Sequence, residues 1–513
     1  MRINKKIVLS PMLSFIVLSA IAIILSGILS ILHVQTDYQT VNTVTNELTT
    51  NVVEVESLFS LSGLKYIVTN AVSDFVSFVP LSMLLITLIG IGILEKSGFM
   101  RTALTLVTRK MSKNVVTFLV IFISILFSLF GDIGFVIMLP ISALLFKYGK
   151  RNPTGGIIAS FAALSFGYGV NIFLSSMDSS LLSLTTNAAK LLNMGYTIGN
   201  FFALLIMLVL LISLSIIFTR ITEKRIMPLL PKYEFSEEDE SYIITNKDLR
   251  GLIIAILVAI IYLLIVIYSI IPGLPLSGGL LDHGGARYID MIFGDNSLFN
   301  KGFVFIITLW FFLIGLSYGM ITKSIRTNKD LTKGLSHSLD GIGSVIVLLF
   351  FASLFISIFK KTNIGVVITA LLTKILTLHS FTGVGLIIVF LLIVMISNLF
   401  STSSLIKWSI MSGIAVPMFM NASLSPEFAQ VIFTAGDSIT NGITPLFAYF
   451  VIYIAFLEKY SQNDIITIKK GIRYMIPYGI STFVVWFIVL VGWYIAGIPL
   501  GIGGFTTIPF NLK

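Results

Sequence analysis

The sequence predicts an all-α polytopic membrane protein with about nine transmembrane helices and two opposed re-entrant hairpins in an inverted repeat. Composition predicts the class: apolar residues make up 56% of the 513 residues, charged residues only 11%, and the mean hydropathy is +0.99. Such a composition excludes a water-soluble globular domain. The arrangement follows from the positions of the apolar runs and of four polar interruptions within them.

Nine apolar runs are long enough to cross a bilayer, which takes roughly 20 residues of helix. The first is too long for a signal-peptide core and has no clear small-residue cleavage site, so we expect a retained first span. The nine expected spans cover about 7–31, 79–95, 154–177, 194–219, 250–271, 302–321, 342–359, 428–456 and 472–496.

Two further apolar stretches, about 114–149 and 383–420, each contain a polar tip. Each half is too short for two full spans, so we expect both stretches to enter and leave on one side as re-entrant hairpins. Segments 62–76 and 364–379 have mixed polarity and are expected to be interfacial helices or ordinary loops. The predicted units are a first span and outer loop (1–60), a first repeat (61–220), a charged cytoplasmic linker (221–249), a second repeat (250–460), and a last span with the C-terminal tail (461–513).

Basic residues predict the orientation, because they accumulate in the cytoplasmic loops of membrane proteins. All of the basic clusters fall on one side if the hairpins do not cross, which places the N-terminus in the cytoplasm and makes the hairpins enter from opposite sides. Inverted repeats require this arrangement. We expect the protein to lie in the plasma membrane. The clusters are Arg2, Lys5 and Lys6; Arg101, Arg109, Lys110 and Lys113; Lys147, Lys150 and Arg151; Arg220, Lys224 and Arg225; and Lys323, Arg326, Lys329 and Lys333.

Several classes of partner and site are excluded by composition. The formal net charge of +10 comes largely from these loop clusters, so topology explains it and no nucleic-acid partner is expected. The absence of cysteine excludes disulfides, iron–sulfur clusters and thiolate metal sites. The four histidines share no metal-ligand spacing, and no cofactor is expected; they are His33, His283, His337 and His379.

Four polar interruptions predict where a ligand binds. In the first half, Ser128–Asp132 is followed by a polar run that contains Asn171, 39 positions after Asp132; in the second half, Asp437 lies 39 positions after Asn398. Backbone groups released from a helix in hydrocarbon need partners, so polar breaks survive where they are buried or line a cavity. Paired breaks in two halves are typical of secondary transporters, whose site lies at the repeat interface.

The residue types at the breaks suit an anion beside a coupling cation. The amides at the start of the helix after a hairpin tip favour a carboxylate, and the hydroxyls of Ser401 and Thr402 add donors. Carboxylate and amide oxygens suit Na⁺, while a carboxylate in a partly desolvated site can instead carry a proton. Alternatively, these groups only satisfy backbone and hold helices together. The expected ion-coupling residues are Asp132, Asp178, Asp437 and Asn441, and the expected ligands for Na⁺, if it is the ion, are Asn171, Asn398, Asp437 and Asn441.

Several strings carry a resemblance to a known family. They are Gly63–Asn70, Phe78–Leu81, Gly90–Gly98, Asn171–Ala189 around Asp178-Ser179-Ser180, Lys407–Ile410 and Gly436–Leu446. In this order, from about residue 60 to residue 460, they resemble the AbgT family of p-aminobenzoyl-glutamate transporters. The resemblance implies nine spans, two opposed hairpins, a homodimer, and membership of the wider ion-transporter group that moves a substrate domain against a scaffold. It also implies uptake of p-aminobenzoyl-glutamate or export of sulfonamide antimetabolites.

The resemblance assigns roles residue by residue. It would let Trp408 stack on an aminobenzoyl ring, although a tryptophan here equally suits packing or anchoring at the interface. Pro426 and Pro445 also match the family, although prolines in membrane helices often only break the helix. Two positions depart from the family: its serine three residues before the tryptophan is Leu405, and its arginine three residues before the second aspartate is Thr434. Loss of the arginine removes a bidentate carboxylate partner. The expected substrate-binding residues, from the breaks and the resemblance together, are Asn171, Ser175, Asp178, Asn398, Ser401, Thr402, Trp408, Pro426, Thr434, Asp437 and Pro445.

Three alternatives remain open. The chain is a transporter of another carboxylate in the same superfamily, a passive channel, or an intramembrane aspartyl protease built on Asp132 and Asp437. The protease pattern is Tyr-Asp with Gly-x-Gly-Asp, and Phe130–Asp132 and Thr434–Asp437 supply neither string. We therefore expect a transporter and not an enzyme.

Overall fold

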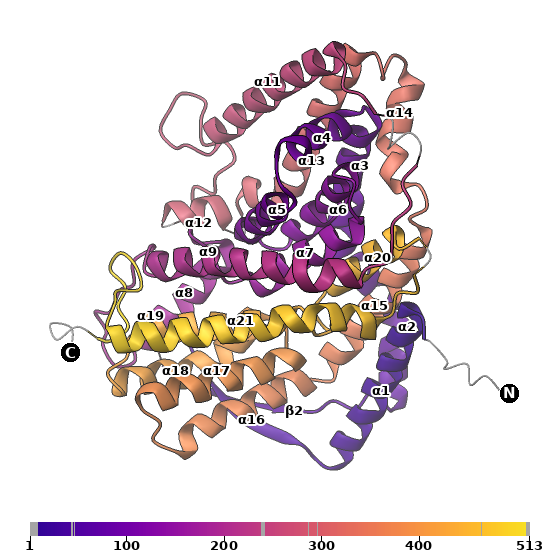
Figure 1. The fold of residues 1–513 in the computed structure, drawn as a ribbon. Helices are drawn as coiled ribbons and strands as arrows, with labels where there is room; N and C mark the ends of the chain where they lie inside the picture. Colours follow the sequence, from indigo (N-terminus) through magenta and orange to yellow (C-terminus); the bar gives the residue numbers. More distant parts are fainter. Residues whose placement is uncertain are drawn as a thin grey trace.

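The computed structural model is mostly helical, as the sequence predicts (Figure 1). It describes residues 9–42, 45, 47–236, 242–285, 287–294, 296–462 and 464–508. The helices are α1 (Pro11–Ile31), α2 (Leu61–Val76), α3 (Val79–Lys96), α4 (Phe99–Lys110), α5 (Lys113–Phe127), α6 (Ile133–Tyr148), α7 (Pro153–Phe166), α8 (Ser176–Ala189), α9 (Leu204–Ile221), α11 (Asn246–Ser269), α12 (Tyr288–Phe293), α13 (Leu298–Thr322), α14 (Asn328–Ser336), α15 (Gly343–Lys361), α16 (Ile364–Leu378), α17 (Gly383–Phe400), α18 (Ser404–Asn421), α19 (Pro426–Asn441), α20 (Phe450–Tyr460) and α21 (Ile468–Ala496).

The expectation of an all-α chain missed one antiparallel strand pair. The strands β1 (Gln35–Val41) and β2 (Leu48–Glu54) lie where the sequence predicts an outer loop. Both are rich in threonine and valine, whose β-branched side chains favour extended backbone. The pair packs against α16 and α18, and a hydrogen bond from the Lys374 ammonium holds the pKa of Asp37 below its usual range.

Seven of the nine predicted spans each contain one continuous helix, namely α1, α3, α9, α11, α13, α15 and α21, although the span 194–219 was predicted to begin ten residues before α9 does. The other two predictions, 154–177 and 428–456, are wrong as continuous helices. In the first, α7 ends at Phe166 and α8 begins at Ser176; in the second, α19 ends at Asn441 and α20 begins at Phe450. Among the described residues nine helices have the length and hydropathy of a span, and they include α5 and α17 but neither interrupted span.

Both predicted hairpins are a helix, a break and a second helix. The outer ends of α5 and α6 meet, since Arg151 Nη1 donates to the Lys113 carbonyl (3.3 Å). The outer ends of α17 and α18 lie beside the C-terminal part of the chain: Gly383 adjoins Tyr494, and Ile508 donates to the Ser423 carbonyl. Re-entry into a bilayer and an inverted repeat stay predictions. Segments 62–76 and 364–379 are the helices α2 and α16, so the loop alternative is wrong for both.

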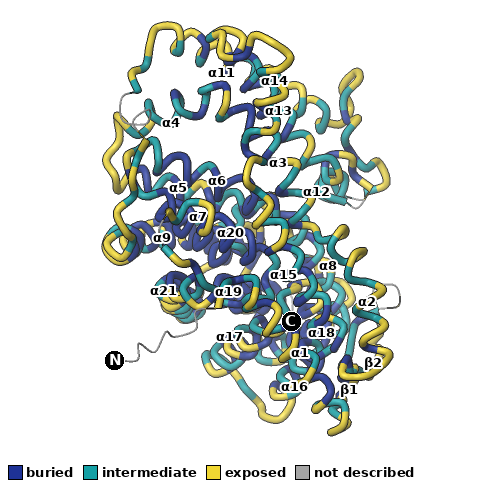
Figure 2. The backbone as a smooth tube through the Cα atoms, turned by 90° about the vertical axis from the view of Figure 1, so that its right-hand side faces the viewer, coloured by how far each residue is buried: buried dark blue, intermediate teal, exposed yellow. Residues whose placement is uncertain are grey.

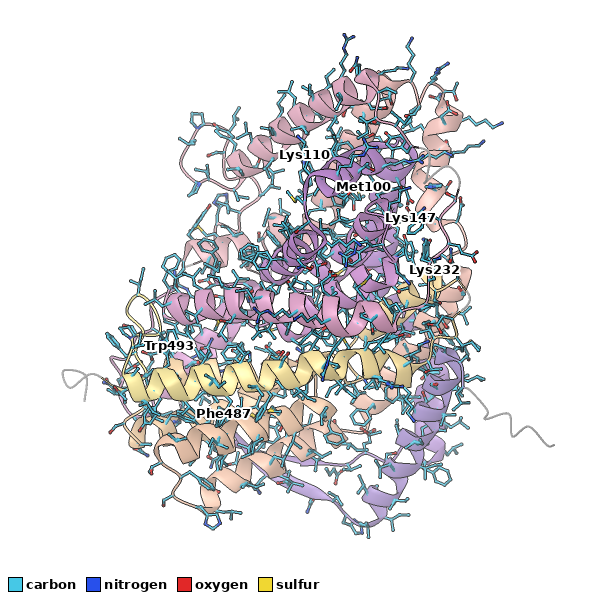
Figure 3. The ribbon with its side chains drawn as sticks, in the orientation of Figure 1. Met100, Lys110, Lys147, Lys232, Phe487 and Trp493 are labelled. Carbon is cyan, nitrogen blue, oxygen red and sulfur yellow. The ribbon has the colours of Figure 1, made fainter. Side chains whose placement is uncertain are left out.

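Some basic segments from different parts of the sequence lie beside one another. Arg151 pairs with Glu223, and Ser324 donates to the Ser97 carbonyl (2.8 Å). Figure 3 shows Lys147 and Lys232 on one side of the molecule and Trp493 on the opposite side. The N-terminal cluster (Arg2, Lys5 and Lys6) lies outside the described residues, as do 237–241 of the predicted linker and 509–513 of the tail.

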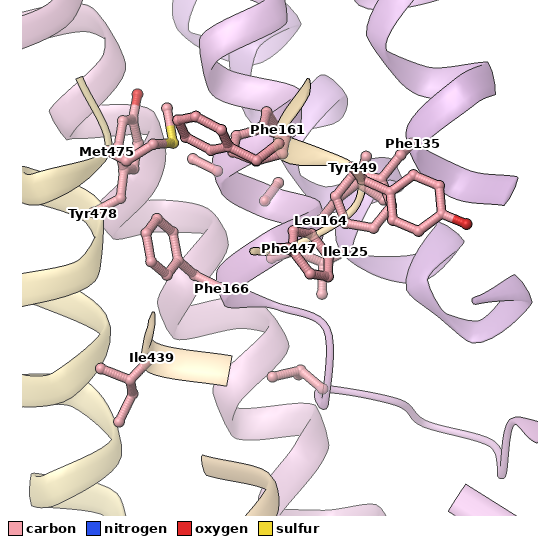
Figure 4. Close-up of a cluster of buried hydrophobic side chains, with 14 of the residues drawn as sticks. Ile125, Phe135, Phe161, Leu164, Phe166, Ile439, Phe447, Tyr449, Met475 and Tyr478 are labelled. Carbon is pink, nitrogen blue, oxygen red and sulfur yellow. The ribbon is translucent and has the colours of Figure 1, made fainter. Parts of the chain in front are cut away.

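The centre of the molecule is built from α7 and α19, whose residues are all buried (Figure 2). Aromatic rings fill the space around them: Phe135 stacks on Tyr449 with 4.8 Å between ring centroids (Figure 4), and Phe161 stacks on Tyr453 at 4.2 Å. At the periphery, only 11% of the apolar window of α11 is buried, as expected for a helix that faces lipid. The breaks at the ends of α7 and α19 therefore lie inside the protein.

Candidate functional site

The two breaks of the first half are joined by hydrogen bonds. The Ser128 hydroxyl, at the tip between α5 and α6, contacts Asn171 Oδ1 (2.9 Å) and the Gly167 carbonyl (3.3 Å) in the segment between α7 and α8. The tip thus satisfies a carbonyl that the end of α7 leaves free, as membrane depth requires.

The second half contains the same joint. Asn398 Nδ2, at the end of α17, donates to the Asp437 carbonyl (2.7 Å) and to Asn441 Oδ1 (2.9 Å). In both halves, the tip residue reaches partners 39 and 43 positions later. This agreement is what an internal repeat predicts. It also corrects the register, because Asn398 corresponds to Ser128 and not to Asp132.

Asp178 closes the first half of the site through a helix cap. Its Oδ2 accepts hydrogen bonds from Ser175 N (3.0 Å), Ser175 Oγ (2.7 Å) and Asn171 Nδ2 (2.8 Å). Ser175 Oγ accepts in turn from Asp178 N (3.1 Å), which completes a capping box at the start of α8. These contacts hold the unwound segment 167–175 against the new helix.

Asp437 closes the second half through a buried ion pair. The Lys407 ammonium, on α18, contacts both Asp437 Oδ1 and Asn398 Oδ1, and its side chain is 0% exposed. Ser404 Oγ donates to Asp437 Oδ2 (2.5 Å). The sequence prediction named Asp437 and Asn398 and missed Lys407. The signal was present, since an ionisable residue inside an apolar helix marks a functional site by default.

Both breaks of the first half line a cavity of about 280 Å³, and residues of α18 and α19 complete its wall. Asp132, Asp178 and Asp437 line it, and no Lys or Arg is among the described residues of its wall. The Gly169 amide donates to Ser438 Oγ (3.2 Å) and so ties the first half to the second at the cavity floor. The volume is slightly below the range of pockets for drug-sized ligands, roughly 300–1,000 Å³.

A second cavity of about 360 Å³ adjoins the first. The two share four wall residues, Asp132, Tyr168, Met177 and Ser404. Lys360, an exposed residue near the end of α15, also lines the second cavity and is the single basic residue among the described wall residues of both. Sequence reasoning missed Lys360, because nothing local distinguishes it from other lysines at helix ends.

The predicted site residues fall into three groups. Those that line the first cavity are Asp132, Asn171, Ser175, Asp178, Thr434 and Asp437, together with the departing position Leu405. Those that line the second are Asp132, Ser401, Thr402 and Asn441. Those that line neither are Asn398, Trp408, Pro426 and Pro445.

Trp408 is fully buried and packs inside the protein. Its Nε1 donates to Thr185 Oγ1 (2.9 Å), and its ring lies 4.6 Å from the Phe433 ring, centroid to centroid. Pro426 occupies the first turn of α19, where proline is favoured. In this conformation neither side chain reaches a ligand in the cavities, and their binding roles stay predictions.

The four expected Na⁺ ligands belong to two separate hydrogen-bond clusters. Asn171 binds Ser128 and Asp178, while Asn398, Asp437 and Asn441 are held together around Lys407. Among the described residues, no three His, Asp or Glu side chains lie close enough to hold a metal ion.

The segment around α12 covers one end of the first cavity. Phe293 lines the wall, and its carbonyl accepts from Ser176 Oγ (3.3 Å) at the start of α8. Arg287 and Asp290 form an ion pair (2.9 Å), and both contact Ser179 Oγ. The hydrogen bond from Arg287 holds the pKa of Asp290 below its usual range.

Comparison with known proteins agrees with this architecture. The model of the AbgT putative transporter family matches residues 3–508. The p-aminobenzoyl-glutamate transport protein of Escherichia coli (strain K12) is 28% identical over 495 residues, which is 96% of this chain and 93% of the relative.

Two solved structures are also similar. The MtrF protein of Neisseria gonorrhoeae, described as illuminating a class of antimetabolite efflux pumps, is 30% identical, with a TM-score of 0.50 over 97% of this chain and 98% of that one. The YdaH transporter of Alcanivorax borkumensis, described as having an unusual topology, is 27% identical, with a TM-score of 0.49 over 96% of this chain and 100% of that one. The family match spans nearly the whole chain, and the chain therefore belongs to the AbgT family of membrane transporters.

Proposed function

We propose that this chain is a secondary active transporter of a small organic anion of the p-aminobenzoyl-glutamate type, an exporter of sulfonamide-like antimetabolites, or both, coupled to H⁺ or Na⁺. The observation that carries the proposal is the first cavity, which lies between the two breaks of the first half and the helices α18 and α19 of the second half. Its wall combines elements of both halves, the place where transporters with internal repeats bind their substrates.

The chemistry of the two cavities supports an amphipathic aromatic substrate. Phe130, Phe293, Phe299 and Phe303 give the first cavity aromatic surface, on which an aminobenzoyl or sulfonamide ring can pack. Lys360 and the hydroxyls of Ser401 and Thr402 lie in the second cavity, where a carboxylate would find donors. The Escherichia coli relative is named a p-aminobenzoyl-glutamate transport protein, and the Neisseria gonorrhoeae relative is described with antimetabolite efflux pumps, which supports the two parts of the proposal.

A second candidate is transport of another carboxylate, such as a dicarboxylate. Thr434 favours it, because this position lacks the arginine that the family resemblance leads one to expect, and Thr434 lines the first cavity. A smaller anion held by amides and hydroxyls needs no such arginine.

Two other classes are less well supported. Both carboxylate oxygens of Asp437 are engaged, one by Lys407 and one by Ser404, whereas an aspartyl protease needs two carboxylates that share a proton. A passive channel would not need the paired breaks of an alternating-access transporter.

The setting is part of the proposal. We infer a plasma-membrane protein with a cytoplasmic N-terminus from the distribution of basic residues along the sequence, and the contacts between basic segments support the inference. We also infer a homodimer, which the family resemblance implies.

Transport in proteoliposomes tests the proposal. Purified protein is reconstituted, and uptake of radiolabelled p-aminobenzoyl-glutamate, a sulfonamide and a dicarboxylate is followed under separately imposed Na⁺ and pH gradients. We expect saturable counterflow of at least one compound and accumulation driven by one of the gradients. Linear, non-saturating flux without counterflow would indicate a channel and would overturn the proposal.

A further inference from the structure

We propose that the Lys407 ammonium is a built-in cation, which takes the place of a coupling Na⁺ in the second half of the site. The proposal rests on the transport function above and specifies its ion chemistry. It concerns the cluster that Asn398, Ser404, Lys407 and Asp437 form between α17, α18 and α19.

The oxygen atoms around the ammonium are those a small hard cation would use. Lys407 Nζ contacts a carboxylate oxygen of Asp437 and the amide oxygen of Asn398. Asn398 is also the residue that joins the two breaks of this half through the Asp437 carbonyl and Asn441. A cation at this point therefore holds the joint of the repeat together, and oxygen ligands of this kind suit Na⁺ as well as an ammonium.

Lys407 is placed to act inside the protein and not on the ligand directly. Its side chain is 0% exposed, and it lines neither cavity. Asp437 stands between the ammonium and the first cavity and lines that cavity. The ammonium therefore neutralises the Asp437 carboxylate, and an anionic ligand in the cavity does not meet an uncompensated negative charge there.

The other charged groups on neighbouring elements have their own partners. Asp178, on α8, is held by Ser175 and Asn171. Lys374, on α16, pairs with Asp37 of β1. Among the described residues, Asp437 is thus the acidic partner assigned to Lys407.

The corresponding position of the first half is apolar. The register set by Ser128 and Asn398 aligns Lys407 with Ile137, which is buried in α6. The repeat scaffold therefore does not require an ammonium at this point, and its presence in the second half belongs to the chemistry of the site.

Removal of the ammonium should create a site for free Na⁺. Lys407→Ala leaves the Asp437 and Asn398 oxygens and the volume of the lysine chain, whereas Lys407→Met removes the charge and fills the same volume. We expect NaCl, compared with choline chloride at equal ionic strength, to raise the melting temperature of detergent-solubilised Lys407→Ala. The rise should continue with each tenfold increase in Na⁺ once the site is filled, as mass action requires. Lys407→Met should be destabilised and should not respond specifically to Na⁺.

The wild-type protein supplies the second arm of the test. We expect any Na⁺-specific shift of the melting temperature to be the same in wild type and in Asn398→Ala. A Na⁺ site elsewhere in the molecule would shift both proteins equally, so it does not affect the comparison. A Na⁺-specific shift in wild type that Asn398→Ala abolishes would overturn the proposal, and so would a Lys407→Ala protein indifferent to Na⁺. If Lys407→Ala cannot be purified, the wild-type comparison decides. Neither readout uses a substrate, so failure of the transport proposal is recognised separately, by the absence of counterflow.

Discussion

Removing one partner of the ion pair between Lys407 and Asp437 should cost more stability than the loss of its own contacts, because the other partner is left charged and buried. Asp437→Asn keeps the size of the side chain and one acceptor oxygen but leaves the Lys407 ammonium buried without a counter-charge. Lys407→Met has the reverse effect on the Asp437 carboxylate. Both single variants therefore strand a charge at a site where one side chain is 0% and the other 5% exposed.

The magnitude follows from the burial. Removing one partner of a buried, hydrogen-bonded ion pair costs roughly 3–5 kcal/mol, whereas replacing both partners by neutral groups of similar size is often nearly neutral. Ser404 Oγ, which donates to Asp437 Oδ2, can also donate to the amide oxygen of an asparagine. We therefore expect each single variant to lose about 3–5 kcal/mol and the double variant Lys407→Met/Asp437→Asn to lose clearly less than the sum.

Two measurements carry the test. Unfolding of purified wild type, both single variants and the double variant in detergent gives the coupling energy of the double-mutant cycle. Counterflow in proteoliposomes then separates stability from transport. A folded double variant should lose gradient-driven accumulation, although added ligand should still raise its stability, because the built-in cation and its counter-charge are gone. Additive losses, with a coupling energy near zero, would show that the two groups do not act as a pair.

The other predictions use single substitutions. Thr434→Arg should tighten binding of p-aminobenzoyl-glutamate by roughly 1.5–3 kcal/mol, about one to two decades, and leave an uncharged sulfonamide nearly unaffected; equal effects in a binding assay would show that position 434 does not read carboxylates. Lys360→Ala should weaken anion binding two- to fivefold, about 0.5–1 kcal/mol for an exposed charge, while the control Lys361→Ala, which breaks a pair outside the cavities, should not. Trp408→Phe should lower the free energy of unfolding by about 1 kcal/mol, because one hydrogen bond is lost. The ratio of the affinities for p-aminobenzoyl-glutamate and a sulfonamide should stay unchanged in a binding assay, and a changed ratio would favour ring stacking by Trp408. Asp290→Asn should lower the free energy of unfolding by less than about 1 kcal/mol. Because the pKa of Asp290 is lowered in the folded protein, this loss should be full above the ordinary pKa of 3.8 and vanish as the pH falls through the lower folded value. A difference in melting temperature between variant and wild type that persists at lower pH would contradict this assignment.

The sequence was sufficient to predict most helices but not all of the chain. Runs of apolar residues give span positions directly, because lipid selects for apolar length. The strand pair β1–β2 escaped notice, because its threonine-rich strands lie outside the apolar runs and have little hydrophobic alternation. The interruptions within 154–177 and 428–456 were recognised as polar, but hydropathy alone does not say where a helix unwinds.

The residues of the site were predictable where a local signal exists and not where tertiary contacts decide. Asp437 stands out as an acid in an apolar helix. Lys407 carries the same local signal, but its pairing with Asp437, 30 positions away, is decided by the packing of α18 on α19. Trp408, whose position suggested a ligand contact, instead points into the interior, because the direction of a side chain from a helix depends on its neighbours.

The two halves share their joints but not their charges. The register that aligns Ser128 with Asn398 also places Gly167 opposite Asp437, so the ion pair has no counterpart in the first half. Changes at Ser128 or Asn398 should therefore act on the architecture that both halves use. Changes at Asp437 or its partner should act on ion chemistry that only the second half supplies. A transporter built this way can keep the symmetry that alternating access needs in its backbone, and confine the asymmetry that coupling needs to a few side chains.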